Sequence, residues 1–125
     1  MSRKNWSSEK IYERLLTNKS KKTYWDNIGE LRSRPNNKVF KRAFSLTNSK
    51  YKKEKIIGID ILAQLGFNPR VFKKETLKRY FELLDSENDT EVLMSLFYAI
   101  GHNNENLTSK QISKMVRFKN HKNTV

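Results

Sequence analysis

Residues 59–66 of this 125-residue chain read IDILAQLG, and related segments stand at 25–32 (WDNIGELR) and 94–101 (MSLFYAIG). The offsets between the three segments are 34 and 35 residues. A fixed period of this size is typical of a supersecondary unit that is copied and stacked, because one unit cannot bury its own apolar face. The sequence therefore predicts a helical repeat protein.

Each of these segments falls in the second helix of an expected helical hairpin. Apolar spacing, capping residues and the two prolines predict helices at residues 8–18, 21–33, 38–47, 52–65, 71–84 and 90–100. Ser7 is the expected N-cap of the first helix, with Trp6 and Ile11 forming a hydrophobic staple across it. Gly66 and Gly101 are expected to end the fourth and sixth helices.

The hairpins are expected to form a single all-α domain with units at about 8–34, 37–66 and 70–102 and an incomplete unit at 107–125. The second helices of units two and three are apolar on nearly all sides, which predicts central positions. The first helices are apolar on one side only, so we expect them to be half-exposed. The incomplete unit carries an apolar stripe without a covering helix, which favours a homodimer or an extended solenoid; the stripe contains Ile112, Met115 and Val116.

Residues 55–66, together with 89–92 leading into 98–102, resemble the HEAT-repeat family, and the likeness covers about residues 10–120. Within that family, the chain resembles small bacterial HEAT-repeat proteins of unknown function. This resemblance implies a right-handed α-α superhelix of about three and a half hairpins. HEAT-like solenoids serve as scaffolds, transport receptors, adaptors and toxin-immunity proteins, and one bacterial group consists of DNA glycosylases.

The chain carries 26 Lys and Arg against 13 Asp and Glu, a formal net charge of +13. Such a surplus favours polyanionic partners, although an AT-rich genome rich in lysine codons would also produce it. There is no cysteine, which excludes disulfides and thiolate sites and fits a reducing compartment. No run of 18 apolar residues is present, so we expect a soluble, cytoplasmic protein without a membrane partner.

Lysines gather before the second helices of units one and two. The repeat offset places Lys19 over Lys53 and Lys21 over Lys55, so stacking would align both groups along one edge. Cations oppose the dipole at a helix start, which an anionic partner would offset. The sequence therefore predicts a binding edge for an acidic protein or a nucleic acid, with a merely solvated edge as the alternative; its residues are Lys19, Lys21, Lys22, Lys50, Lys52, Lys53 and Lys55, with Lys41 and Arg42 as further candidates.

Unit three has carboxylates at the equivalent edge. Acidic side chains favour a helix start, and the spacing of a calcium loop is absent, so we interpret them as structural caps. They are Asp85, Glu87, Asp89 and Glu91.

Trp25 and Asp26 permit an enzymatic alternative. The HEAT-like DNA glycosylases use tryptophans and an aspartate around a cationic lesion, and an aromatic face with a carboxylate suits such chemistry. Adjacent residues lie about 100° apart on a helix, however. We therefore expect Trp25 to be a core residue, and the recurrence of Asp26 and Asp60 at one repeat position to mark an inter-repeat hydrogen bond.

Other chemistry has little support in the sequence. His102 and His121 are the only histidines and are 19 residues apart, which does not make a zinc motif. The four glycines form no phosphate-binding loop, and no nucleophile motif is present. We therefore expect no metal, no cofactor and no catalytic site, and we predict a non-catalytic module that binds another macromolecule.

Overall fold

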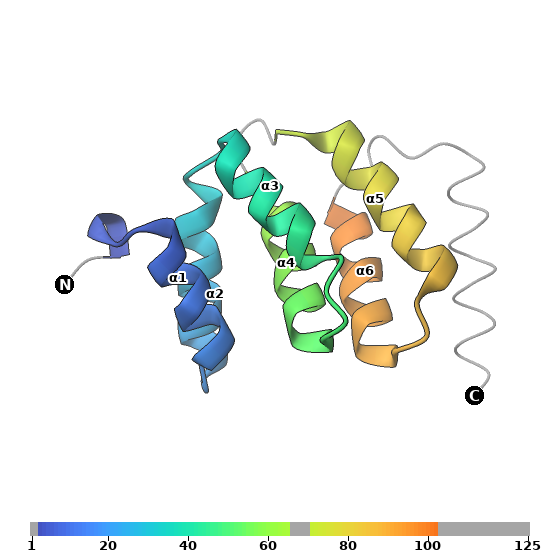
Figure 1. The fold of residues 1–125 in the computed structure, drawn as a ribbon, viewed down its shortest axis with the longest axis horizontal. Helices are drawn as coiled ribbons and strands as arrows, with labels where there is room; N and C mark the ends of the chain where they lie inside the picture. The colour runs from blue at the N-terminus through green and yellow to red at the C-terminus, as the bar shows by residue number, and fades with distance from the viewer. Residues whose placement is uncertain (1–2, 66–70, 103–125) are drawn as a thin grey trace.

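The computed structural model describes residues 3–65 and 71–102. Regular structure in these ranges is helical throughout, which confirms the all-α prediction (Figure 1). The elements are a short 3-10 helix η1 (Arg3–Asn5) and the helices α1 (Ser8–Thr17), α2 (Lys21–Arg32), α3 (Asn37–Leu46), α4 (Lys52–Gln64), α5 (Lys73–Ser86) and α6 (Thr90–His102). The expected fourth unit and Gly66 lie outside the described residues.

Side-chain caps start the first three helices. The Ser7 Oγ accepts a hydrogen bond from the Lys10 N–H at 3.1 Å, which confirms the predicted N-cap. The Ser20 and Asn36 side chains cap α2 and α3 in the same way. Each cap satisfies a backbone N–H that lacks a partner within its helix. Trp6, directly before Ser7, is half-buried against the core.

Three helix ends in the third hairpin each differ from the prediction by two residues, and one of them is the end of α5 at Ser86 instead of residue 84. α5 begins at Lys73 instead of residue 71 because Phe72 adopts the left-handed conformation, with φ 58° and ψ 30°. The Phe72 ring stacks on Phe40 with 4.3 Å between ring centroids, and this contact offsets the backbone strain. α6 does not end at Gly101 but continues through it to His102.

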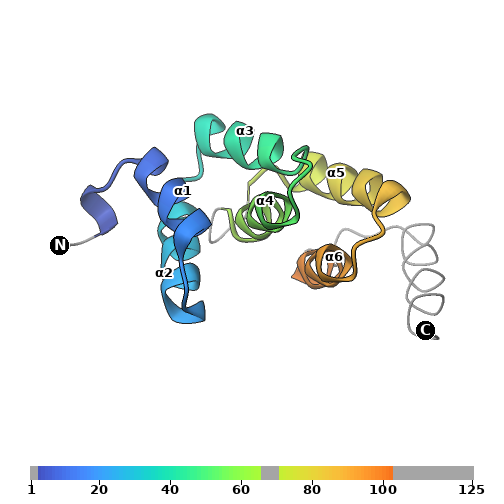
Figure 2. The same ribbon diagram turned by 60° about the horizontal axis from the view of Figure 1, so that its bottom comes forward.

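The helices form two layers. The second helices α2, α4 and α6 form one layer, in which α4 contacts both α2 and α6. α3 packs against α4, and Figure 2 shows α3 and α5 together on one side of this second-helix layer. α4 is central, as predicted, with Ile57, Ile59 and Ile61 almost fully buried. α6 was also predicted to be buried on nearly all sides, but this was wrong, because Met94 and Tyr98 are exposed.

α3 and α4 lie very close together at Gly58. A Cβ atom at this position would lie 2.6 Å from the Ala43 carbonyl oxygen and 2.9 Å from the Thr47 backbone nitrogen. Both atoms belong to the backbone of the α3 region, so they could not move aside independently. The absence of a side chain at Gly58 therefore sets the separation of these two helices.

Polar side chains join neighbouring hairpins. The Tyr24 hydroxyl of α2 donates to the Asp60 carboxylate of α4 at 2.5 Å, and the Tyr80 hydroxyl of α5 donates to the Ile59 carbonyl at 2.9 Å. The expected inter-repeat hydrogen bond is therefore confirmed for Asp60. Asp26 instead pairs with Lys22 of its own helix at 3.0 Å.

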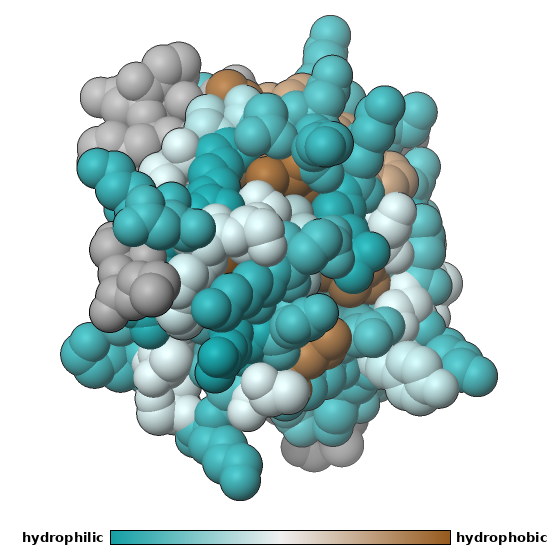
Figure 3. All heavy atoms as spheres, turned by 60° about the vertical axis from the view of Figure 1, so that its left-hand side comes forward, coloured by the Kyte–Doolittle hydropathy of each residue, from teal (hydrophilic) through white to brown (hydrophobic). Residues whose placement is uncertain are grey.

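The outer face beside α1 and α2 is mostly hydrophilic, with small separate apolar areas (Figure 3). Within residues 3–65 and 71–102, no helix has both the length and the apolar character that crossing a membrane requires.

Candidate binding groove and lysine edge

The three second helices begin at one edge of the molecule, the lower edge in Figure 1. The seven predicted lysines precede or open α2 and α4 there, and we call them the lysine edge: Lys19, Lys21, Lys22, Lys50, Lys52, Lys53 and Lys55. Lys41 and Arg42 belong to α3, in the other layer. Since α2 and α4 are in contact, the two groups of lysines are neighbours in space.

Two members of the lysine edge pair with carboxylates of the next hairpin. The Lys55 Nζ lies 2.9 Å from Glu87 Oε1, and the Lys52 Nζ lies 2.9 Å from Glu91 Oε1 and 3.9 Å from Asp89 Oδ2. Lys55 and Glu87 are 25% and 8% exposed, so little water screens this pair. The positive charge at the start of α4 is thus partly neutralised by the α5–α6 connection.

The same carboxylates support the start of α6. Asp89 Oδ1 accepts hydrogen bonds from the backbone N–H groups of Glu91 at 2.9 Å and Val92 at 3.2 Å. Glu87 Oε2 accepts one from the Asp89 N–H at 3.0 Å. These bonds confirm the predicted structural role of Asp89 and Glu87. Over the described parts of the chain, no three His, Cys, Asp or Glu side chains are grouped to hold a metal.

The other lysines of the edge remain available to a partner. Lys22 is paired with Asp26, but this exposed pair stabilises the chain by at most about 1 kcal/mol. The remaining four lysines of the edge have no carboxylate within 4.0 Å of their amino groups among the described residues; they are Lys19, Lys21, Lys50 and Lys53. All four are exposed.

A groove of about 850 Å³ opens next to these lysines on the second-helix layer. α4 forms its floor, and α2 and α6 form its walls, as their arrangement in Figure 2 allows. We define the groove by its lining residues: Lys21, Tyr24 and Trp25 of α2; Lys52, Lys53, Ile56, Ile57 and Asp60 of α4; and Glu91, Met94, Ser95 and Tyr98 of α6.

Trp25 is a groove residue, so the expectation that it lies in the core was wrong. Its side chain is 42% exposed and meets the Tyr24 ring edge-on, with 5.2 Å between centroids. α2 turns Asn27, Ile28 and Leu31 to the core, and Trp25 lies at the border of that face. A hydrophobic residue at such a border becomes buried only when another element covers it.

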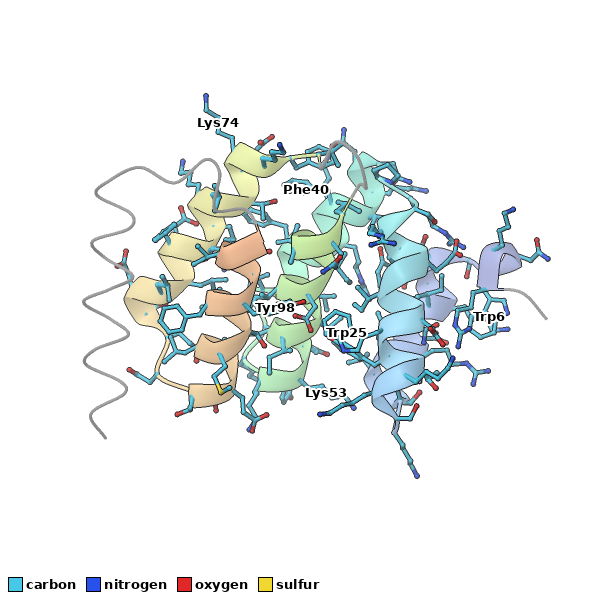
Figure 4. The ribbon with its side chains drawn as sticks, turned by 180° about the vertical axis from the view of Figure 1, so that it is seen from behind. Trp6, Trp25, Phe40, Lys53, Lys74 and Tyr98 are labelled. Atoms are coloured by element: carbon cyan, nitrogen blue, oxygen red, sulfur yellow. The ribbon has the colours of Figure 1, made fainter. Side chains whose placement is uncertain are left out.

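Sequence reasoning missed the α6 wall of the groove. Met94 and Tyr98 are 67% and 56% exposed, although the apolar character of α6 predicted burial. A smaller hollow of about 200 Å³ continues from the groove, and Trp25 and Tyr98 line both. Figure 4 shows Trp25 between α2 and α4 and Tyr98 on the side of α4 that faces α6, with Lys53 nearer the edge at which α4 begins. The repeat offset gave no signal for this exposure, because Ile59 occupies the same repeat position as Trp25 and Met94 and is fully buried.

Asp60 gives the floor of the groove its electrostatic character. Burial raises the pKa of the Asp60 carboxyl to about 6, although the hydrogen bond from Tyr24 acts in the opposite direction. Burial, followed by the nearby Asp60 charge, raises the pKa of Tyr24 well above its usual range. Asp60 is therefore mainly ionised at pH 7. Asp26, the residue of the enzymatic alternative, does not line the groove.

Comparisons of the chain with protein-family models, curated proteins and solved structures gave no match. The resemblance to HEAT repeats therefore remains a prediction from the residues.

Proposed function

We propose that this chain is a HEAT-like right-handed solenoid that acts as a non-catalytic binding module for a polyanionic macromolecule, an acidic protein or a nucleic acid. The observation that carries the proposal is the group of exposed lysines where α2 and α4 begin that have no carboxylate partner within residues 3–65 and 71–102. Cations at these helix starts oppose the helix dipole by a few tenths of a kcal/mol each. A partner that brings negative charge would turn this unfavourable arrangement into a favourable one.

The pairing of Lys52 and Lys55 sharpens the proposal. These two lysines already have carboxylates within 2.9 Å, so a partner would have to compete with them. Lys19, Lys21, Lys50 and Lys53 have no such competitor among the described residues. We therefore assign the main electrostatic contacts to these four side chains.

Binding of fluorescent oligonucleotides and of polyglutamate, measured at several salt concentrations, tests the proposal. The double variant Lys21→Gln/Lys53→Gln removes two charges from the edge, whereas the control Lys38→Gln/Lys74→Gln removes two exposed charges from α3 and α5. Figure 4 shows Lys53 and Lys74 at opposite ends of the molecule. For each lysine that neutralises a phosphate, its replacement should reduce the slope of log K against log salt by about 0.7–0.9.

We expect the edge variant to weaken binding and flatten the salt dependence, with the control close to wild type. Equal effects of the two variants would show that net charge alone attracts the polyanion, and the proposed edge would then be wrong. Failure of every polyanion to bind at physiological salt would overturn the proposed function itself.

The enzymatic alternative was expected at Trp25 and Asp26, and Asp26 does not line the groove; one observation favours a version with Asp60 in its place, since the exposed Trp25 ring lines the same groove as the Asp60 carboxyl. A glycosylase of this kind would release a base from alkylated DNA and lose this activity in the Asp60→Asn variant. Release that persists in Asp60→Asn, or no release at all, would remove Asp60-dependent catalysis from consideration.

A further inference from the structure

The groove combines flat aromatic surface with positive charge. The Trp25 and Tyr98 rings are about half-exposed on opposite walls, and both also line the adjoining hollow. Lys21 and Lys53 line the same groove and have no carboxylate partner among the described residues. Exposed apolar surface that is concentrated in a concave site is typical of a binding surface.

The dimensions of the groove suit a small planar group. Its volume of about 850 Å³ falls within the range of about 300–1,000 Å³ seen for ligand pockets. A nucleobase could enter from a single strand and place its face against an aromatic ring. In a duplex the base faces are already covered by neighbouring bases, and exposing one requires unstacking. The groove therefore favours single strands.

The distribution of charge follows the structure of a nucleotide. Lys53 lies toward the edge where α4 begins, and Trp25 of α2 and Tyr98 of α6 lie farther from that edge (Figure 4). Phosphates near the lysines would leave the uncharged bases to enter the groove, where the Tyr24 hydroxyl and the Asp60 carboxylate form the polar part of the floor. An acidic peptide that entered the groove would bring carboxylates close to the Asp60 carboxylate on its floor.

We propose that the groove binds single-stranded nucleic acid, with bases stacked on Trp25 and Tyr98 and backbone phosphates held by Lys21 and Lys53. This inference rests on the proposed function and names its partner class. Trp25 and Tyr98 supply sequence-tolerant stacking, and the lysines supply the salt-dependent part of the affinity. The site therefore selects strandedness and not base sequence.

The chain's two tryptophans allow a direct test. In Trp6→Phe, Trp25 is the only tryptophan, so its fluorescence reports on the groove. We would titrate this variant with an oligothymidylate of about 10 nucleotides, an abasic oligomer of equal charge, the corresponding duplex, and polyglutamate. We expect the oligothymidylate to quench Trp25 and to bind at least about 10-fold more tightly than the abasic oligomer.

Substitution of Trp25 tests the stacking contact. Trp25→Ala should weaken oligothymidylate binding by about 5- to 150-fold and leave the affinity for the abasic oligomer unchanged. Trp25→Phe keeps an aromatic ring and should retain most of the affinity, and circular dichroism would confirm that both variants fold. Trp6→Phe serves as the matched control, because Trp6 is not among the groove residues.

The outcomes separate this inference from the proposed function. Equal binding of the oligothymidylate and the abasic oligomer, with no effect of Trp25→Ala, would overturn the groove site but leave polyanion binding intact. Stronger binding of the duplex, or polyglutamate binding that depends on Trp25, would also overturn it, in the latter case in favour of an acidic protein. If neither oligomer nor polyglutamate binds, both proposals fail.

Discussion

Replacing Gly58 with alanine should destabilise the protein, although alanine is the better helix former. In a helix interior the exchange stabilises by about 1 kcal/mol through backbone propensity. At Gly58, however, the new Cβ would lie 2.6 Å from the Ala43 carbonyl oxygen and 2.9 Å from the Thr47 backbone nitrogen. Neither atom can move unless α3 and α4 separate, so we use the upper end of the overpacking cost, about 3 kcal/mol. The expected net loss is about 2 kcal/mol.

The matched control is Gly29→Ala in α2, where no atom lies within 4 Å of the added Cβ. Without a clash, this variant should gain up to about 1 kcal/mol. For a chain of this size 1 kcal/mol shifts Tm by about 4 °C, so Gly58→Ala should melt about 8 °C below wild type and Gly29→Ala slightly above it. Thermal unfolding followed by circular dichroism measures both. Equal gains in the two variants would refute the close α3–α4 contact.

Two further predictions concern buried charges. The pKa of Asp60 is raised to about 6 in the folded protein, so the folded state binds more protons than the unfolded state between about pH 4 and 6. As the pH rises through this window, the free energy of unfolding of the wild type should therefore fall by up to about 3 kcal/mol relative to that of Asp60→Asn. Urea unfolding midpoints at pH 4.5 and 7.5 measure this difference, and parallel pH profiles would contradict it. Glu87→Gln should cost about 1–2 kcal/mol because it leaves the Lys55 ammonium, 25% exposed, without its partner at 2.9 Å. As a control, Glu91→Gln removes an exposed partner of Lys52 and should cost less than about 1 kcal/mol. A loss of stability in Glu87→Gln that is smaller than in Glu91→Gln would show that the Lys55–Glu87 pair is not protected from water.

Much of the fold could be predicted because its signals are local. Ser7 caps α1 and the 3.6-residue apolar period marks each helix, so every limit of α1 to α6 lies within two residues of expectation. The later start of α5 arose where a tertiary contact overrides local preference. Phe72 takes the left-handed conformation beside the ring of Phe40.

The lysine edge was predictable as a position but not as a set of charges. The repeat offset can be counted in the sequence, and it places the lysines of α2 and α4 at equivalent positions of two adjacent hairpins. Which lysines are neutralised depends on the α5–α6 connection, because Glu87 and Glu91 reach across to Lys55 and Lys52. In the sequence these carboxylates have only a local role at the start of their own helix.

The groove depends on the packing of the helices. A helical pattern shows that Trp25, Met94 and Tyr98 are hydrophobic, but it does not show whether a neighbouring helix covers them. That depends on how α2 and α6 stand on either side of α4, which is set by contacts between residues more than 30 positions apart, such as the hydrogen bond from Tyr24 to Asp60. Local periodicity thus defines the helices and their edges, whereas the exposure of their apolar faces results from long-range packing.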